Sequence, residues 1–261
     1  MGSYIKTSVD PCDDFYEYAC GNYFEINKEE PSLGQLNISL DNRYYQNHLV
    51  LRKYTTKHNI LVLPPGILQK PMYHSKMLAA YNFGSMGGNI IGHEMVHAFD
   101  SIGRKYGKTG REENWWSSTS LAEFNKRAQC FVEQYNEYTI DAIFTNVNGT
   151  STLAENIADN GGVRLGFYAY KKWAEEHQDK GFLADLYKFM NVSQEQLYFW
   201  SFAHASCSEF KRKGLLRIAK DVHIADKFRV IGPLSNFDEF GKAFNCEIGT
   251  PMNPTKKCVL W

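Results

Sequence analysis

The clearest pattern along the chain is an apolar stripe at helical spacing downstream of Ser120. Its members follow one another at intervals of three or four residues, and they are Leu121, Phe124, Ala128, Phe131 and Tyr135. Ser120 and Glu123 have the spacing of a capping box, which satisfies backbone N–H groups in the first turn of a helix. The pattern therefore predicts an amphipathic helix whose apolar face lies in the core.

Other segments favour further helices and one strand. Helices are predicted over Asn89–Asp100, Glu155–Glu176, Phe182–Met190 and Gln194–Ala219. The apolar run Ile60–Leu63 stops at a Pro-Pro-Gly sequence, which predicts a short buried strand.

The two ends of the chain show less regular patterns. Asp10–Lys53 is polar, rich in aromatic residues and too small for a domain, whereas three prolines predict that Asp226–Trp261 is rich in loops. We therefore predict a mainly α fold with a small β component. The change in texture at Tyr54 divides the chain into a short region, 1–53, and one domain, 54–261.

The composition excludes several classes of protein. Of the 261 residues, 43% are hydrophobic, which is enough for one large core or two modest ones and excludes a disordered chain. Lys and Arg total 29, as do Asp and Glu, so no net charge attracts nucleic acid or an anionic membrane. The apolar runs are far shorter than the roughly 18 residues of a spanning helix. Met1–Asp10 shows no secretory signal.

Six cysteines stand outside any C-x-x-C pair, so cysteine zinc cages and thioredoxin-like motifs have no support. Their even number favours disulfides in an oxidising compartment, as do glycosylation triplets at Asn37, Asn148 and Asn191. Because no signal is visible, we expect the native start to differ from Met1.

An H-E-x-x-H segment, His93 to His97, lies on a predicted helix. Histidines four residues apart share a helix face and can bind one metal ion. Glu94 is turned about 100° away and can take a proton from a bound water. Neutral imidazoles suit Zn²⁺, and three protein ligands leave a position for that water. On this pentapeptide alone, two surface histidines beside an exposed glutamate are an almost equal alternative.

Further acids lie at helical spacing from one another or from the histidines. Glu155 and Asp159 are four residues apart, so Glu155 can supply a third ligand while Asp159 orients a ligating histidine. A solvated acidic pair near a helix start is the alternative. Asp100 follows His97 by three residues, so it either orients His97 or is a surface aspartate.

Several ordered motifs carry a resemblance to a known family. They are His93–Asp100 (HEMVHAFD), Glu155–Gly162 (ENIADNGG), Asp221–His223 followed by Phe228-Arg229, Asn253-Pro254 and Cys258–Trp261 (CVLW). Together they resemble the neprilysin family of zinc metallopeptidases (M13), which includes the endothelin-converting enzymes. The resemblance runs from about Tyr54 to Trp261, and Pro11–Gly21 resembles the start of that family's ectodomain. It implies a thermolysin-like zincin catalytic domain at 54–261 and a remnant of the ectodomain at 1–53.

The resemblance also implies roles for the site residues. His93, His97 and Glu155 would bind one Zn²⁺, Glu94 would be the general base, and Asp159 would be the partner of His93. His223 would hydrogen-bond the oxyanion formed from the scissile carbonyl, a contact that commonly costs a hundredfold or more in rate when removed. Arg229 would bind a backbone carbonyl of the substrate.

The implied protein is a zinc endopeptidase that cleaves oligopeptides on the amino side of hydrophobic residues. It would act outside the cell or at its surface, with a membrane anchor in the full-length form only and self-association left open. The family's cysteine pattern implies the bridges Cys12–Cys246, Cys20–Cys207 and Cys130–Cys258.

The chain also departs from the family. Almost all of a large N-terminal helical domain is missing, and Leu51, Arg52 and Lys53 replace residues with which the family holds substrate against an edge strand. Ser206 and Asn89 alter the side-chain pocket. The alternative function is therefore a truncated, catalytically impaired family member that binds zinc or a partner without efficient turnover. A structural zinc module has less support, because such sites usually have four protein ligands.

Overall fold

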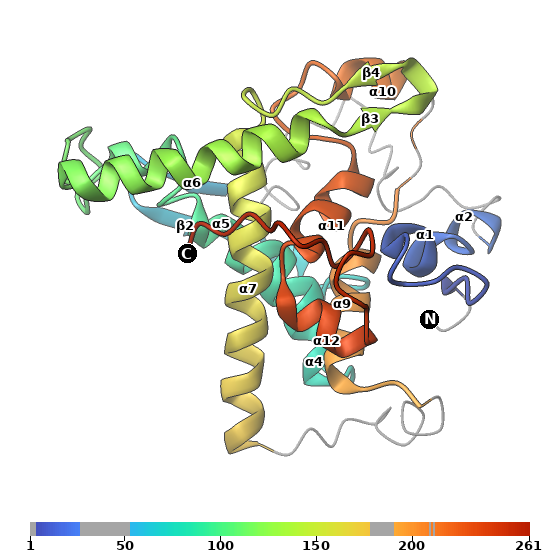
Figure 1. Ribbon diagram of the computed structural model, residues 1–261. Coiled ribbons are helices and arrows are strands. Elements are labelled where there is room, and N and C mark those ends of the chain that lie inside the picture. The colour runs from blue at the N-terminus through green and yellow to red at the C-terminus, as the bar shows by residue number, and fades with distance from the viewer. Residues whose placement is uncertain (1–3, 27–52, 178–190, 209, 211) are drawn as a thin grey trace.

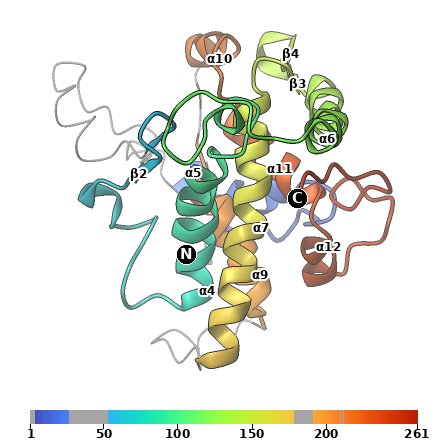
Figure 2. The ribbon, with the colours of Figure 1, turned by 90° about the vertical axis from the view of Figure 1, so that its left-hand side faces the viewer.

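Two helical segments lying side by side form the centre of the fold (Figure 2). One is continuous through α4 (Ala79–Asn82), the π-helical η5 (Phe83–Gly92) and α5 (His93–Val96); the other is α7 (Leu153–Glu176). The structure is a computed structural model that describes residues 4–26, 53–177, 191–208, 210 and 212–261. It is mainly helical, as predicted, and its strands form two small hairpins (Figure 1).

Glycines allow these two segments to touch along their backbones. A Cβ atom on Gly162 would lie 2.6 Å from the His93 nitrogen and 2.7 Å from the Gly88 oxygen, which is closer than real contacts allow. The prediction of a helix over 89–100 was wrong at both ends, because the glycine-rich stretch before Asn89 is helical and the helix ends at Val96. His97 caps it and still donates its N–H to the His93 oxygen.

α6 (Ser118–Asn136) confirms the apolar stripe, because Phe124, Ala128, Phe131 and Tyr135 are buried in it. The predicted start was three residues late. Ser117 is the N-cap, and its hydroxyl accepts the Ser120 N–H at 3.0 Å.

The predicted helix over 194–219 is two helices, α9 (Gln194–His204) and α10 (Arg212–Ile218). The chain leaves the helix after His204, close to Cys207, which is bonded to Cys20. The helix predicted over 182–190 lies outside the described residues.

The C-terminal part is more helical than predicted. It contains α11 (Asp226–Ser235) and α12 (Asp238–Phe244). Pro233 was taken as a helix breaker, but α11 continues through it and ends two residues later, at Ser235.

The two hairpins are small and exposed. β1 (Lys53–Thr55) pairs antiparallel with β2 (Ile60–Val62), and β3 (Thr139–Ile140) pairs with β4 (Thr145–Asn146) across the 3₁₀ turn η7 (Asp141–Ile143). The prediction of a buried strand was wrong in burial, since Ile60 is 52% exposed and Val62 is 46% exposed. The hairpin lies over the site and not inside the core.

Two main clusters of buried side chains form the core. The larger joins the N-terminal helix α1 (Phe15–Cys20) to α4, α7, α9 and α12, with Phe15, Tyr81, Phe167 and Tyr198 at its centre. The second lies between α6, the start of α7 and α11. The short helices α2 (Tyr23–Ile26), η4 (Pro65–Ile67) and η6 (Gly103–Lys105) complete the described elements.

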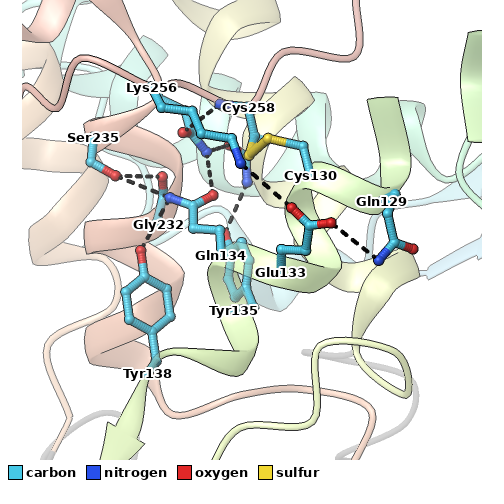
Figure 3. Close-up of a disulfide and its surroundings, with 12 residues drawn as sticks. Gln129, Cys130, Glu133, Gln134, Tyr135, Tyr138, Gly232, Ser235, Lys256 and Cys258 are labelled. Atoms are coloured by element: carbon cyan, nitrogen blue, oxygen red, sulfur yellow. Dashed lines mark hydrogen bonds and ion pairs between the residues drawn. A yellow bond between two sulfur atoms is a disulfide. The ribbon is translucent and has the colours of Figure 1, made fainter. Parts of the chain in front are cut away.

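All three implied disulfides are present: Cys12–Cys246, Cys20–Cys207 and Cys130–Cys258. Figure 3 shows the last of them beside Gln134, whose amide donates to Tyr138 at 3.2 Å and to Ser235 at 3.4 Å. The first two bonds fasten the N-terminal strip to the body.

Two surface features complete the description. Of the glycosylation triplets, Asn148 and Asn191 are exposed, and Asn37 lies outside the described residues. None of the described helices combines the length and apolar character needed to cross a bilayer.

Candidate active site

Two histidines on the central helix are each held by a carboxylate. His93 Nδ1 lies 2.7 Å from Asp159 Oδ1, and His97 Nδ1 lies 2.6 Å from Asp100 Oδ2. An ionised carboxylate can only accept a hydrogen bond, so each Nδ1 carries the hydrogen and each Nε2 presents a lone pair. Both imidazoles are therefore in the tautomer that binds a metal through Nε2.

These lone pairs converge on one point together with a third donor. The Nε2 atoms of His93 and His97 are 3.1 Å apart, and Glu155 oxygens lie 3.3 and 3.6 Å from them. Glu155 Oε2 is buried and accepts no hydrogen bond. Donor separations of about 3.3 Å are those expected around a tetrahedral Zn²⁺ with bonds of about 2.1 Å. The three residues therefore fit one zinc ion.

The electrostatic field at this point favours a cation. Burial lowers the pKa of His97, but its hydrogen bond to Asp100 and the charge of Glu155 outweigh burial and raise that pKa. Burial raises the pKa of Glu155, but His93, His97 and His223 bring it below its usual value. Positive charge between these side chains is stabilised in both cases, whether a proton or a metal ion supplies it.

Asp159 connects the site to a buried arginine. Arg229 Nε donates to Asp159 Oδ2 at 2.8 Å, and Nη2 donates to Oδ1 at 2.7 Å. Burial raises the pKa of Asp159, but the Arg229 guanidinium and His93 outweigh it and hold the pKa well below its usual range. The arginine thus keeps the carboxylate ionised and fixed in direction beneath His93.

Asp100 is buried rather than a surface residue, with 2% of its surface exposed. Its Oδ1 accepts the N–H groups of Ile102 and Gly103, both at 2.7 Å, while Oδ2 faces His97. The turn after α5 therefore fixes the carboxylate that orients His97.

Glu94 lies beside the three converging donors and is largely buried. Its Oε2 accepts the backbone N–H of Tyr54 at 2.7 Å. Tyr54 belongs to β1, so a strand borders the site. Leu51 and Arg52 lie outside the described residues.

His223 reaches the site from a bend between α10 and α11. Its Nδ1 lies 2.8 Å from Asp221 Oδ1, and its Nε2 lies 3.3 Å from Glu155 Oε2. The backbone N–H of His223 also donates to Asp221. This local turn holds an exposed imidazole at the rim of a pocket of about 470 Å³, whose lining includes His93, Glu94 and Arg229.

The structure thus brings every predicted site residue into one constellation. Two contributions escaped sequence reasoning. The Tyr54 donor is a backbone group and leaves no sequence signal. Asp221 could have been found from its two-residue spacing to His223. The side-chain amide of Asn89 donates a hydrogen bond to Ser206 Oγ at 2.9 Å, so these two polar side chains are paired with one another.

Comparisons with known proteins agree with this geometry. The sequence profile described as Peptidase family M13 matches residues 53–260. The endothelin-converting enzyme homolog of Locusta migratoria is 44% identical over 209 residues, which is 80% of this chain and 28% of that protein. Neprilysin-2 of Drosophila melanogaster is 35% identical over 263 residues, 99% of this chain and 33% of that protein.

A solved structure is also similar. The Mycobacterium tuberculosis zinc metalloprotease Zmp1, in complex with an inhibitor, superposes with a TM-score of 0.69 at 30% identity, over 76% of this chain and 30% of that one. This chain therefore spans about a third or less of the length of each of these three proteins.

Proposed function

The chain belongs to peptidase family M13, and from that membership we propose that it is a zinc-dependent endopeptidase. The observation that carries the proposal is the convergence of three unprotonated donors, from His93, His97 and Glu155, beside an acid that does not share their point of convergence. Structural zinc sites usually have four protein ligands. Three ligands next to a carboxylate that can act as a general base fit hydrolysis better.

When bound to these residues, zinc would polarise the scissile carbonyl and lower the pKa of a water to about 7. The protein's own groups would do the rest. Glu94 would take the proton from the water and pass it to the departing amine. The Tyr54 N–H holds one Glu94 oxygen, which fixes the direction of the other.

His223 and Arg229 would act on the substrate. His223 would donate from Nε2 to the oxygen that gains negative charge, with Asp221 stabilising the imidazolium this requires. Arg229 uses Nε and Nη2 to hold Asp159, which leaves Nη1 for a backbone carbonyl of the peptide. In this role one arginine would link substrate position to the orientation of His93.

The finer properties follow from the family. We propose peptide substrates cleaved on the amino side of hydrophobic residues, with residues 54–261 as the catalytic domain. Action outside the cell or at its surface is supported by three disulfides, because such bonds persist in oxidising compartments.

The test combines metal content with one conservative substitution. Chain produced under oxidising conditions should bind one zinc ion and cleave a peptide containing a hydrophobic residue. Glu94→Gln should keep the zinc and lose about 10² to 10⁴ in rate. Glu155→Gln should bind zinc more weakly by a similar factor. If the zinc-loaded Glu94→Gln variant cleaved the peptide as fast as the parent chain, the proposal would be contradicted.

A further inference from the structure

α10 carries a group of exposed cations directly before the segment that reaches the site. Arg212, Lys213 and Arg217 lie on the helix, and Lys220 lies in the turn that follows it. In the described part of the chain, none of these four side chains forms an ion pair. We call these four residues the basic strip.

All four residues of the basic strip are exposed, while another side of α10 packs against the core. Leu215, Ile218 and Ala219 are partly buried against the cluster beneath α6. They are three and four residues apart and share one helix face, whereas Lys213 and Arg217 form an exposed i, i+4 pair. The charges are thus held in place by a helix anchored through its apolar side.

The strip also lies close to the pocket. The Asp221 N–H donates to the Ile218 oxygen at 2.9 Å, and Asp221 in turn holds His223 at the pocket rim. Five residues separate Ile218 from His223, so the end of α10 is within about 18 Å of it. Figures 1 and 2 both place α10 at the end of α7 that carries Glu155.

We propose that the basic strip binds an acidic segment of the peptide substrate while the scissile bond lies at His93, Glu94 and His97. This inference rests on the peptidase activity proposed above and specifies its substrate class. Exposed, unpaired cations next to a cleft raise the local concentration of an oppositely charged ligand. The chain's balanced total charge does not prevent this, because the field near α10 is local.

A peptide fits this surface better than a membrane does. Helices that bind bilayers insert a broad apolar face, whereas Leu215 and Ile218 of α10 pack against the core and Leu216 is its one exposed large apolar side chain. An extended peptide advances about 3.3 Å per residue, so the limit of about 18 Å from the end of α10 to His223 corresponds to at most about five residues. We therefore test acidic residues about five positions from the scissile bond.

The experiment uses a charge-reversed variant and a matched control. Lys213→Glu/Arg217→Glu reverses the exposed pair. Lys126→Glu/Lys172→Glu makes the same charge change at exposed lysines on α6 and α7 that form no ion pair with any residue in the described ranges. Labelled peptides carry three glutamates, or three glutamines, about five residues from a hydrophobic cleavage site, on either side of it. Affinity is measured by fluorescence anisotropy on a Glu94→Gln background, and kcat/KM on the active chain.

We expect the first variant to lose about fivefold or more in affinity and kcat/KM for a glutamate peptide, and the loss to shrink at high salt. The glutamine peptides and the control variant should be unaffected. Equal loss on both peptide types, or no loss on either glutamate peptide, would overturn the inference. So would loss of binding to phosphatidylserine vesicles with unchanged peptide affinity. Strip-dependent binding without any cleavage would refute the peptidase activity alone.

Discussion

Tyr54 donates its backbone N–H to Glu94 Oε2 at 2.7 Å, from a strand forty residues upstream in the chain. The relationship is specific to one of the two carboxylate oxygens. The direction of the proposed base therefore depends on the position of β1.

Replacing Tyr54 with proline removes this donor without removing the strand's extended backbone. Because the N–H points toward Glu94, proline at this edge position breaks no contact to β2 through that group. Hydrogen bonds to charged groups contribute about 1.5–3 kcal/mol, so kcat should fall about 10- to 100-fold. Tyr54→Ala keeps the N–H and is the control. Zinc content should be equal in both variants; similar kcat values would show that the contact does not position Glu94.

The pair formed by Asp159 and Arg229 should be strongly coupled. Arg229→Gln removes the charged partner of the buried Asp159 carboxylate and leaves it only the His93 hydrogen bond; breaking a buried ion pair typically costs about 3–5 kcal/mol of unfolding free energy. Asp159→Asn combined with Arg229→Gln should cost less than the sum of the two single changes. A double-mutant cycle by urea unfolding measures this coupling. If the losses in unfolding free energy of the two single variants simply added up in the double variant, the two side chains would not be coupled as the geometry indicates.

Gly162→Ala should separate the two central helices. Its Cβ would meet backbone atoms of His93 and Gly88, which cannot rotate away as a side chain can. We expect a loss of about 2 kcal/mol in stability and about tenfold or more in zinc affinity, since His93 would move relative to Glu155. Gly87→Ala is the matched control, because there the new Cβ meets only the Phe83 side chain at an ordinary 3.5 Å. Unchanged zinc affinity in Gly162→Ala would contradict the close-packing argument.

His204 should make stability depend on pH. It is buried, stacks on Trp200 and lies 3.1 Å from the Tyr81 hydroxyl, and burial lowers its pKa from 6.5 to about 4. Between about pH 4 and pH 6.5, His204 is therefore protonated in the unfolded chain and neutral in the folded chain. Its contribution is complete above about pH 6.5 and is lost as the pH falls toward 4, by about 3 kcal/mol in total.

The measurement compares urea midpoints across this pH range for the parent chain and His204→Gln. The variant should lose less stability than the parent on acidification. His58→Gln removes an exposed histidine and should behave as the parent does. An identical pH profile for all three proteins would remove His204 as the source.

The sequence predicted the site better than the fold around it. Histidines four residues apart must share a helix face, so the spacing of His93 and His97 predicted a ligand pair before any coordinates existed. The apolar stripe on α6 likewise predicted, from spacing alone, which side chains of that helix are buried. Glycines misled the analysis, because the stretch before Asn89 looks like a loop but serves a close helix crossing that only tertiary structure reveals. Pro233 also misled it, since α11 continues through this proline to Ser235.

Partners that lie far apart in the chain were accessible only in part. Asp159 could be predicted as an acid on the same helix face as Glu155, but nothing in its local sequence shows that Arg229 reaches it. The disulfide partners came from the family resemblance and not from spacing. The Tyr54 contact was invisible, because every residue except proline carries the same backbone donor.

The order of the cysteines constrains when the crosslinks can form during synthesis. Each of the three bonds has one partner at or after Cys207, and the other at or before Cys130. The elements that carry His93, His97 and Glu155, which are η5, α5 and α7, are therefore made before any native disulfide can form. A ribosome-bound chain that has not reached Cys207 can have no native crosslink, so native disulfide formation begins only after Cys207 has been made.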